Sequence, residues 1–82
     1  MLKAKVIVQL KKEVSDSEGF AVNDALNTIQ PNLCRQVRVG KTYYVDLQTE
    51  DRDMAEAGIL KVCQDILANP VIEEYSYEIY SE

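Results

Sequence analysis

The amino-acid sequence predicts a single α+β domain in which two helices cover one face of a four-stranded antiparallel sheet. The chain has 82 residues, enough for one domain, and its apolar fraction of 46% is typical of a folded protein. Segments with a two-residue apolar period alternate with segments whose apolar period is 3.6 residues. Their order is β-α-β-β-α-β, which two right-handed crossovers fold into the ferredoxin-like arrangement, so residues 1–82 are expected to form one domain.

The first strand and the first helix are predicted from the N-terminal third of the chain. Residues 4–10 are expected to form a strand because every second residue is apolar. A helix is expected over about residues 17–30, since Ser15 or Asp16 can cap its first turn and Pro31 ends it. The apolar stripe of this helix, expected to face the sheet, consists of Val22, Ala25, Leu26 and Ile29.

The middle of the sequence predicts a hairpin. Residues 36–39 and 42–48 both alternate between apolar and polar side chains, and Gly40 lies between them. Glycine readily adopts the positive φ that tight turns require, so Gly40 is expected to form the turn.

A second helix and a last strand complete the predicted fold. The helix is expected over about residues 51–68, because acidic residues in its first turn complement the helix dipole. Asn69 suits the left-handed conformation that ends many helices, and Pro70 prevents continuation. Residues 71–80 are expected to form the last strand. The buried stripe of the second helix is predicted to be Ala55, Ile59, Val62, Cys63, Ile66 and Leu67.

The other face of the predicted sheet is open. It is expected to be mostly polar and to serve self-association or a partner, because the core is small and the sheet has two exposed edges. A plain solvated sheet face is the alternative. The side chains expected on this face are Lys3, Lys5, Ile7, Gln9, Arg38, Tyr44, Asp46, Gln48, Glu74 and Tyr80.

The composition argues against several classes of function. The net charge of −5 does not suit nucleic acid, which requires clustered basic residues. Because there is no histidine, and because Cys34 and Cys63 are far apart, no catalytic residue and no metal site is predicted. Both cysteines are expected to be free thiols of a reducing compartment. No apolar run reaches the roughly 20 residues of a membrane span, and no secretory signal pattern is present, so a cytoplasmic location is expected.

Four stretches of the sequence together resemble the PurS family, the small subunits of bacterial and archaeal phosphoribosylformylglycinamidine (FGAM) synthase. They are residues 3–11, 16–26, 37–41 and 67–73, and they follow one another in the family's order over the whole chain, which has nearly the family's length. One departure is Ser17, which stands where the family often has proline. Proline at a first helical position only pre-sets φ, so this departure puts no function in doubt.

The resemblance implies a non-catalytic subunit of an ATP-dependent amidoligase. The family reaction converts formylglycinamide ribonucleotide, glutamine and ATP to formylglycinamidine ribonucleotide, glutamate, ADP and phosphate. A glutaminase subunit, PurQ, releases ammonia, and a synthetase subunit, PurL, activates the substrate with ATP and Mg²⁺. The small subunit is expected to bridge the two and to assist ammonia transfer. The resemblance therefore implies PurL and PurQ as partners, a homodimer or higher homo-oligomer, and no cofactor on this chain.

The residues expected to contact partners lie in two parts of the chain. Arg38 is one of them because a guanidinium can bind a carboxylate with two hydrogen bonds across an interface. The full set is Arg38, Lys41, Tyr44, Asn69, Pro70, Val71, Ile72 and Glu73. Homodimerisation is expected through the sheet edges or the open face.

Three further motif residues are expected to have structural roles: Asp16 caps a helix, Gly19 allows close packing and Gly40 makes a turn. Two other functions stay open at this point. One is a regulatory domain of the ACT type, which has the same topology and binds an amino acid at a dimer interface. The other is a stand-alone enzyme.

Overall fold

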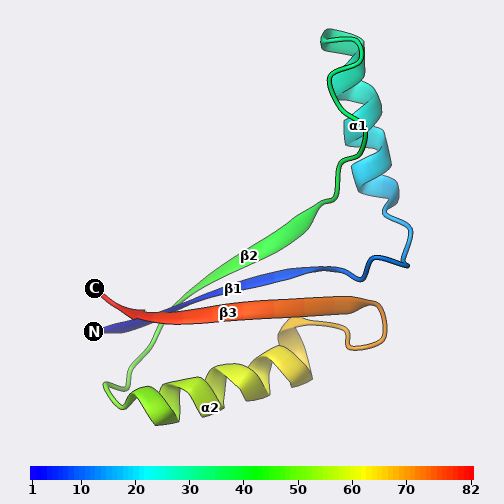
Figure 1. Cartoon of the computed structure of the whole chain (residues 1–82). Coiled ribbons are helices and arrows are strands. Elements are labelled where there is room, and N and C mark those ends of the chain that lie inside the picture. Colours follow the sequence, from blue (N-terminus) through cyan, green and yellow to red (C-terminus); the bar gives the residue numbers. More distant parts are fainter.

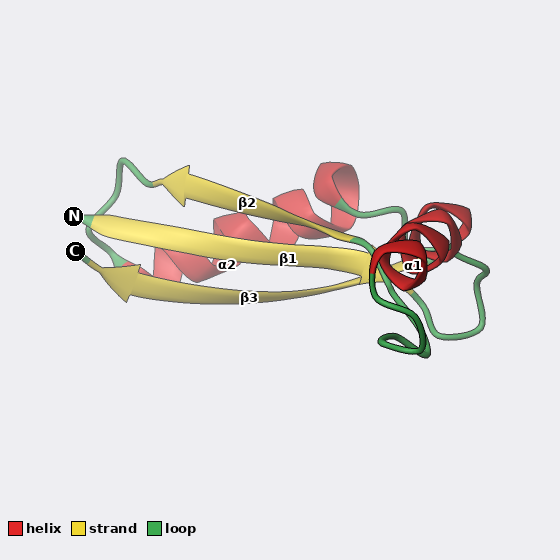
Figure 2. Cartoon of the chain, turned by 90° about the horizontal axis from the view of Figure 1, so that it is seen from above, coloured by secondary structure: helices red, strands yellow, loops and turns green.

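A computed structural model describes all 82 residues of the chain. The elements follow in the order β1 (Leu2–Leu10), α1 (Ser17–Ile29), β2 (Gly40–Asp46), α2 (Arg52–Val62), a π-helix η1 (Cys63–Leu67) and β3 (Glu73–Ser81). The strands form one antiparallel sheet in the order β2-β1-β3, and α2 lies across one of its faces (Figure 2). None of the helices has the length and apolar character needed to cross a membrane.

The sheet has three strands, so the prediction of four strands is wrong. Residues 36–39 form no strand, and there is no hairpin at Gly40, whose φ is not positive. Gly40 instead begins β2, where it pairs with Gln9 of β1. The alternation of residues 36–39 reflects an extended segment that leads directly into β2, as Figure 1 shows.

The hydrophobic core lies between the sheet and α2. Val6 and Val8 at the centre of the sheet are completely buried, and Ile59 of α2 is 2% exposed. Only nine of the 82 residues are buried, so the core is small and depends on the docking of α2. Its cluster consists of Ala4, Val6, Val8, Ile59, Cys63 and Ala68.

The π-helix η1 changes which side chains of the second helix face the core. Its amide–carbonyl bond from Ala68 N to Cys63 O, 3.1 Å long, spans five residues instead of four. Cys63, where the π-helix begins, is fully buried, and the wider turn rotates the side chains that follow it, so that Ile66 is 75% exposed. The predicted burial of Ile66 is therefore wrong. The predicted burial of Ala55, Ile59 and Cys63 is confirmed.

The first helix forms within the predicted bounds but does not cover the sheet. Figure 1 shows α1 projecting beyond the end of the sheet. No residue of α1 belongs to the core cluster, so only α2 covers the sheet as predicted. We call residues 15–39, which comprise α1 and the segment that returns from it to β2, the arm. The arm gives the molecule an elongated shape, with extents of 49, 29 and 13 Å.

The two chain ends lie together at the end of the sheet opposite the arm (Figures 1 and 2). Leu2 of β1 pairs with Ser81 of β3. The Glu82 amide donates to Met1 O at 3.1 Å, which continues this pairing by one residue.

Candidate interaction surfaces

The arm consists of two passes of the chain that bind to each other. Asn27 of α1 donates its side-chain amide to Cys34 O and accepts a hydrogen bond from Cys34 N, both at 2.9 Å. Asn32 reverses the chain direction at a φ of 63°, a conformation that asparagine tolerates well. Closer to the sheet, Gly19 lies against the backbone of Val37 so tightly that a Cβ on Gly19 would overlap Val37 O. The predicted close packing at Gly19 is thus confirmed.

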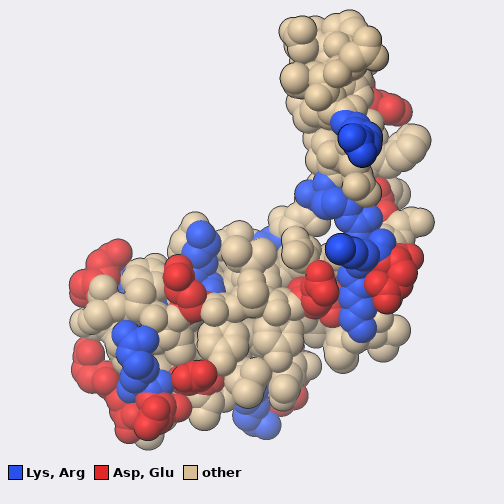
Figure 3. All heavy atoms as spheres, in the orientation of Figure 1, with Lys and Arg blue, Asp and Glu red and all other residues tan.

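The apolar stripe of α1 is uncovered. Val22, Ala25, Leu26 and Ile29 are all exposed, with Ile29 at 82%. The contacts of Gly19 and Asn27 show that the adjoining side of the helix faces the returning segment, so Leu26 lies at the border between the two sides and Ile29 lies away from that segment. On the face seen in Figure 3, the outer part of the arm carries almost no charged side chains. An apolar helix face that lies away from its own core is typical of a surface that binds another protein.

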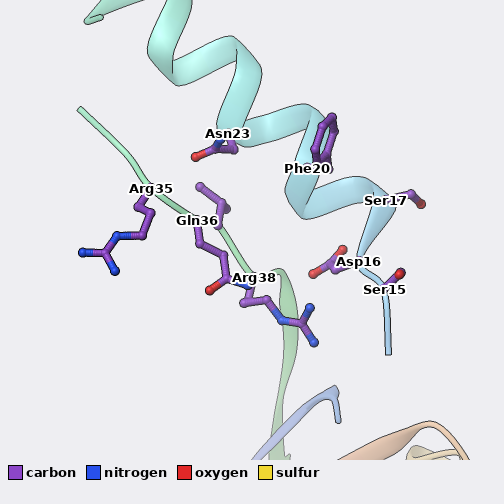
Figure 4. A pocket seen from close by; sticks show the side chains of 9 residues that line it. Ser15, Asp16, Ser17, Phe20, Asn23, Arg35, Gln36 and Arg38 are labelled. Atoms are coloured by element: carbon purple, nitrogen blue, oxygen red, sulfur yellow. The ribbon is translucent and has the colours of Figure 1, made fainter. Parts of the chain in front are cut away.

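A groove of about 580 Å³ lies beside the N-terminal end of α1. Figure 4 shows Phe20 and Asn23 of α1 on one side, and Arg35 and Arg38 of the returning segment on the other. Asn23 Oδ1 is buried there without a hydrogen-bond partner. The sequence interpretation missed this groove, because the predicted hairpin placed residues 36–39 in the sheet.

Arg38 lies at the junction between the arm and the sheet, not on the open face as predicted. Its guanidinium donates to Val14 O at 3.1 Å and to Lys11 O at 2.9 Å. These carbonyls belong to the connection between β1 and α1, so Arg38 holds together the outgoing and returning passes of the chain. Its role in partner binding stays a prediction.

Asp16 is the N-cap of α1, as predicted. Its Oδ1 accepts a hydrogen bond from Gly19 N, and its Oδ2 accepts one from Val39 N, each at 2.8 Å. These two amide donors, first that of Val39 and then that of Gly19, lower the pKa of the Asp16 carboxyl below its ordinary value of 3.8.

We expect Asp16 to make the fold sensitive to acid. Because its folded pKa is lowered, Asp16 stabilises the fold above about pH 3.8 and loses this contribution as the pH falls through the folded value. Urea unfolding of the wild type and of Asp16→Asn, followed from neutral pH to well below this value, measures the effect. The free energy of unfolding should fall less on acidification in Asp16→Asn. An equal fall in both proteins would contradict the prediction.

The segment from Asn69 to Glu73 forms a tight loop next to the arm. Asn69 has no positive φ, so the predicted left-handed conformation is wrong. The side-chain oxygen of Asn69 instead accepts a hydrogen bond from Val71 N at 3.0 Å, and the backbone N–H of Asn69 donates to Glu73 Oε1 at 2.7 Å. Lys41 of β2 lies 3.9 Å from Glu73 Oε2. The structure thus brings Lys41 and the segment together, and Val71, 77% exposed, lies at its surface.

Lys11 connects this loop with the arm. Its amide donates to Ile72 O and its Nζ donates to Pro70 O, both at 2.9 Å, while its own carbonyl accepts from Arg38. Arg38, Lys41 and the loop therefore form one contiguous region at the junction of arm and sheet. Tyr44 is separate from it, at a position of β2 opposite Lys5.

The open face of the sheet is mostly polar, as predicted. The register places Lys3 between Asp46 and Tyr80, and Lys3 Nζ donates to Asp46 Oδ1 at 2.8 Å. Tyr44 is 70% exposed on this face. Gln48 was expected here as well, but β2 ends at Asp46. The expected residues that lie in the sheet are Lys3, Lys5, Ile7, Gln9, Tyr44, Asp46, Glu74 and Tyr80.

The two cysteines are free, as predicted. Cys63 is buried in the core, and Cys34 is partly exposed on the arm. Burial raises the pKa of the Cys63 thiol above its ordinary value of 9.0, which keeps it protonated and unreactive.

Comparison with known proteins identifies the family. The family model described as PurS, phosphoribosylformylglycinamidine (FGAM) synthase, matches residues 3–81. The chain belongs to the PurS family. The FGAM synthase subunit PurS of Bacillus subtilis is 40% identical over 79 residues, which cover 96% of this chain and 93% of that protein. The PurS subunit of Archaeoglobus fulgidus is 37% identical over 73 residues, covering 89% and 91% of the two chains.

Solved structures of PurS proteins have the same fold. The crystal structure of Methanocaldococcus jannaschii PurS has a TM-score of 0.88 and 32% sequence identity, and the match covers 100% of this chain and 99% of that one. A chain in the structure of PurLQS from Thermotoga maritima has a TM-score of 0.84 at 27% identity, with 98% and 99% covered. The PurS resemblance inferred from the sequence is confirmed.

Proposed function

We propose that this chain is the PurS subunit of an FGAM synthase and that it acts by assembling the other subunits. In that enzyme, a PurQ glutaminase would release ammonia from glutamine, and a PurL synthetase would use ATP to place it on formylglycinamide ribonucleotide. The chain holds the two partners together and takes part in no chemical step. ATP and Mg²⁺ are bound by the synthetase, and this chain needs no cofactor. The complex works in the cytoplasm, where the free thiols of Cys34 and Cys63 stay reduced.

The observation that carries this proposal is the arm. A helix whose apolar stripe lies away from its own core gains nothing from that stripe unless another chain covers it. The chain also has no histidine, the usual acid–base group at neutral pH, and the buried Cys63 thiol is protonated. The exposed apolar stripe of α1, on a chain with few reactive groups, favours an assembly role.

A second copy of this chain is the occupant that we assign to the apolar stripe of α1. Identical chains pair through isologous contacts, in which the same surface serves on both copies. The four residues of the stripe, Val22, Ala25, Leu26 and Ile29, recur at helical spacing and carry no charge, which suits a contact between two identical surfaces. A core of this size also benefits from the additional burial that a dimer supplies. This assignment replaces the sheet edges and the open face as the expected dimer contact.

The junction of arm and sheet is the proposed contact with the large subunits. Val71 is highly exposed there, and Lys41, whose side chain is 60% exposed, places its ammonium group near Glu73 of the same loop. Arg38 uses two of its five donors within the chain, so the remaining donors can reach a carboxylate of a partner. The Thermotoga maritima PurLQS structure, which contains a chain of this fold, supports such a complex.

Bridging has a chemical purpose in this reaction. Ammonia that escapes into water is protonated and loses its nucleophilicity, so the synthetase benefits when the glutaminase is docked against it and water is excluded. The chain would keep the two active sites in this arrangement.

Reconstitution with purified PurL and PurQ tests the proposal. We expect glutamine-dependent formation of formylglycinamidine ribonucleotide to require this chain, because ammonia must pass between subunits. Synthesis from added ammonium salt by PurL, which needs no transfer from PurQ, serves as the control and should change much less. Equal glutamine-dependent rates with and without the chain would refute the assembly role.

A further inference from the structure

The arm joins the sheet through two crossings of the chain that lie side by side. One is the connection from β1 to α1, and the other is the end of the returning segment before β2 (Figures 1 and 4). A junction of this kind acts as a flexible hinge when the two crossings are independent of each other. It is rigid when side chains tie them together.

Asp16 is the first tie between the crossings. One carboxylate oxygen accepts from Gly19 N, inside α1, and the other accepts from Val39 N, on the returning segment. A charged carboxylate accepts both bonds at once, and hydrogen bonds to a charged group are the stronger kind. Serine or asparagine at this position can cap α1 but cannot also accept from Val39 with a second oxygen.

Arg38 is the second tie. Whereas the Asp16 side chain extends from the outgoing crossing to the returning one, the Arg38 side chain extends from the returning crossing to the outgoing one. Its side chain leaves the returning segment and donates to carbonyls of Lys11 and Val14, on the other crossing. Lys11 is itself fixed to the loop before β3 through Ile72 O and Pro70 O. Arg38 therefore connects the arm to a part of the chain that is anchored to the sheet.

Gly19 sets how closely the crossings approach. Because a Cβ at Gly19 would overlap Val37 O and also lie 2.9 Å from Asp16 Oδ2, any larger residue pushes α1 away from the returning segment. The glycine is required here by the close approach of two backbones.

We propose that Asp16, Gly19 and Arg38 form a lock that fixes the direction of the arm relative to the sheet. The arm is then a rigid lever, and the apolar stripe of α1 is presented at a fixed angle. The lock is a property of the single chain, and it does not depend on which protein binds the stripe. Its failure in a test is therefore separate from a failure of the proposed assembly role.

The test measures the direction of the arm in the full-length protein. Spin labels are attached to cysteines introduced at two exposed positions, Gln30 on the arm and Glu78 in β3, in a Cys34→Ser background. Cys63 is fully buried and stays unlabelled. The labelled chain is unfolded and refolded with an excess of unlabelled chain, so that double electron–electron resonance reports distances within one chain.

Asp16→Asn is the first variant, because it keeps an oxygen for Gly19 N but places an NH₂ group against Val39 N–H. We expect the label distance to shift or its distribution to broaden, and hydrogen exchange of the Val39 amide to accelerate about tenfold or more. Asp51→Asn is the matched control. Asp51 is the N-cap of α2 and accepts only from amides of its own helix, so this variant should keep the wild-type distance distribution.

Two more variants make the outcome decisive. Gly19→Ala should shift the mean distance, because the added methyl group separates the crossings. Arg38→Gln removes the second tie without touching the helix cap, and it decides the question if circular dichroism shows that Asp16→Asn unfolds α1. Wild-type distance distributions in Gly19→Ala and Arg38→Gln, each with a folded sheet, would overturn the lock.

Discussion

Leu26→Asp is expected to convert the chain from a dimer to a folded monomer. Leu26 lies within the apolar stripe of α1, which is outside the core of its own chain, so a carboxylate there does not disturb the sheet or α2. In the proposed dimer the same carboxylate would be buried without a partner. That costs several kcal/mol, so the dissociation constant should rise by about a hundredfold or more.

Sedimentation velocity over a range of concentrations measures this change. Ala21→Asp is the matched control, because Ala21 is also exposed on α1 but lies on another side of the helix from Leu26. It should keep the wild-type mass. A Leu26→Asp chain that stays dimeric at the concentrations at which the wild type does would show that the stripe is not the dimer contact.

Ile59→Ala is expected to cause the largest loss of stability among single substitutions in α2. Ile59 is 2% exposed in a core that contains very few buried residues, so its truncation should lower the free energy of unfolding by about 2–5 kcal/mol. For a chain of this size that is a large part of the total stability. Urea unfolding at a fixed protein concentration, followed by circular dichroism, gives the value.

Ile66→Ala is the control for this experiment, and it also tests the π-helix. A regular helix would bring Ile66 to the same side as Ile59, seven residues earlier, whereas η1 leaves it 75% exposed. Its truncation should therefore change the free energy of unfolding by no more than about 0.5 kcal/mol. Comparable losses in the two variants would mean that the second helix continues without a π-turn.

The elements of the sheet and of α2 could be predicted from the sequence because local pattern determines them. Val6 and Val8 alternate with polar residues along β1, and Ala55 and Ile59 recur at helical spacing, so each segment indicates both its type and its buried side. Asp16 was recognisable as a helix cap for the same reason, since an N-cap is a local feature. The PurS resemblance also came from stretches distributed along the sequence.

The position of α1 could not be predicted in this way. The stripe containing Leu26 indicates that the helix requires an apolar partner, but it does not say whether that partner is the chain's own sheet or another molecule. The interpretation of Gly40 failed for a related reason. Glycine permits a turn without requiring one, and here Gly40 lies in an extended strand close to the carbonyl of Val8.

Two features of the candidate surfaces depend on tertiary structure. The second hydrogen bond of Asp16, to Val39, joins residues 23 positions apart, and no local pattern indicates it. The π-helix also cannot be recognised from the sequence, because the apolar pattern of residues 63–67 fits a regular α-helix just as well. Both features shape the surface: one orients the arm, and the other exposes Ile66.

The adjacency of Met1 and Glu82 has a practical consequence for engineering the chain. Since Leu2 and Ser81 are paired neighbours, a short linker could join the two ends and make the backbone circular. New ends could then be opened at the exposed turn around Asn32, on the arm at the end of the molecule opposite the original ones. Such a permuted gene product would place a purification tag or a fluorophore at the outermost point of the molecule and leave the sheet's hydrogen bonding intact.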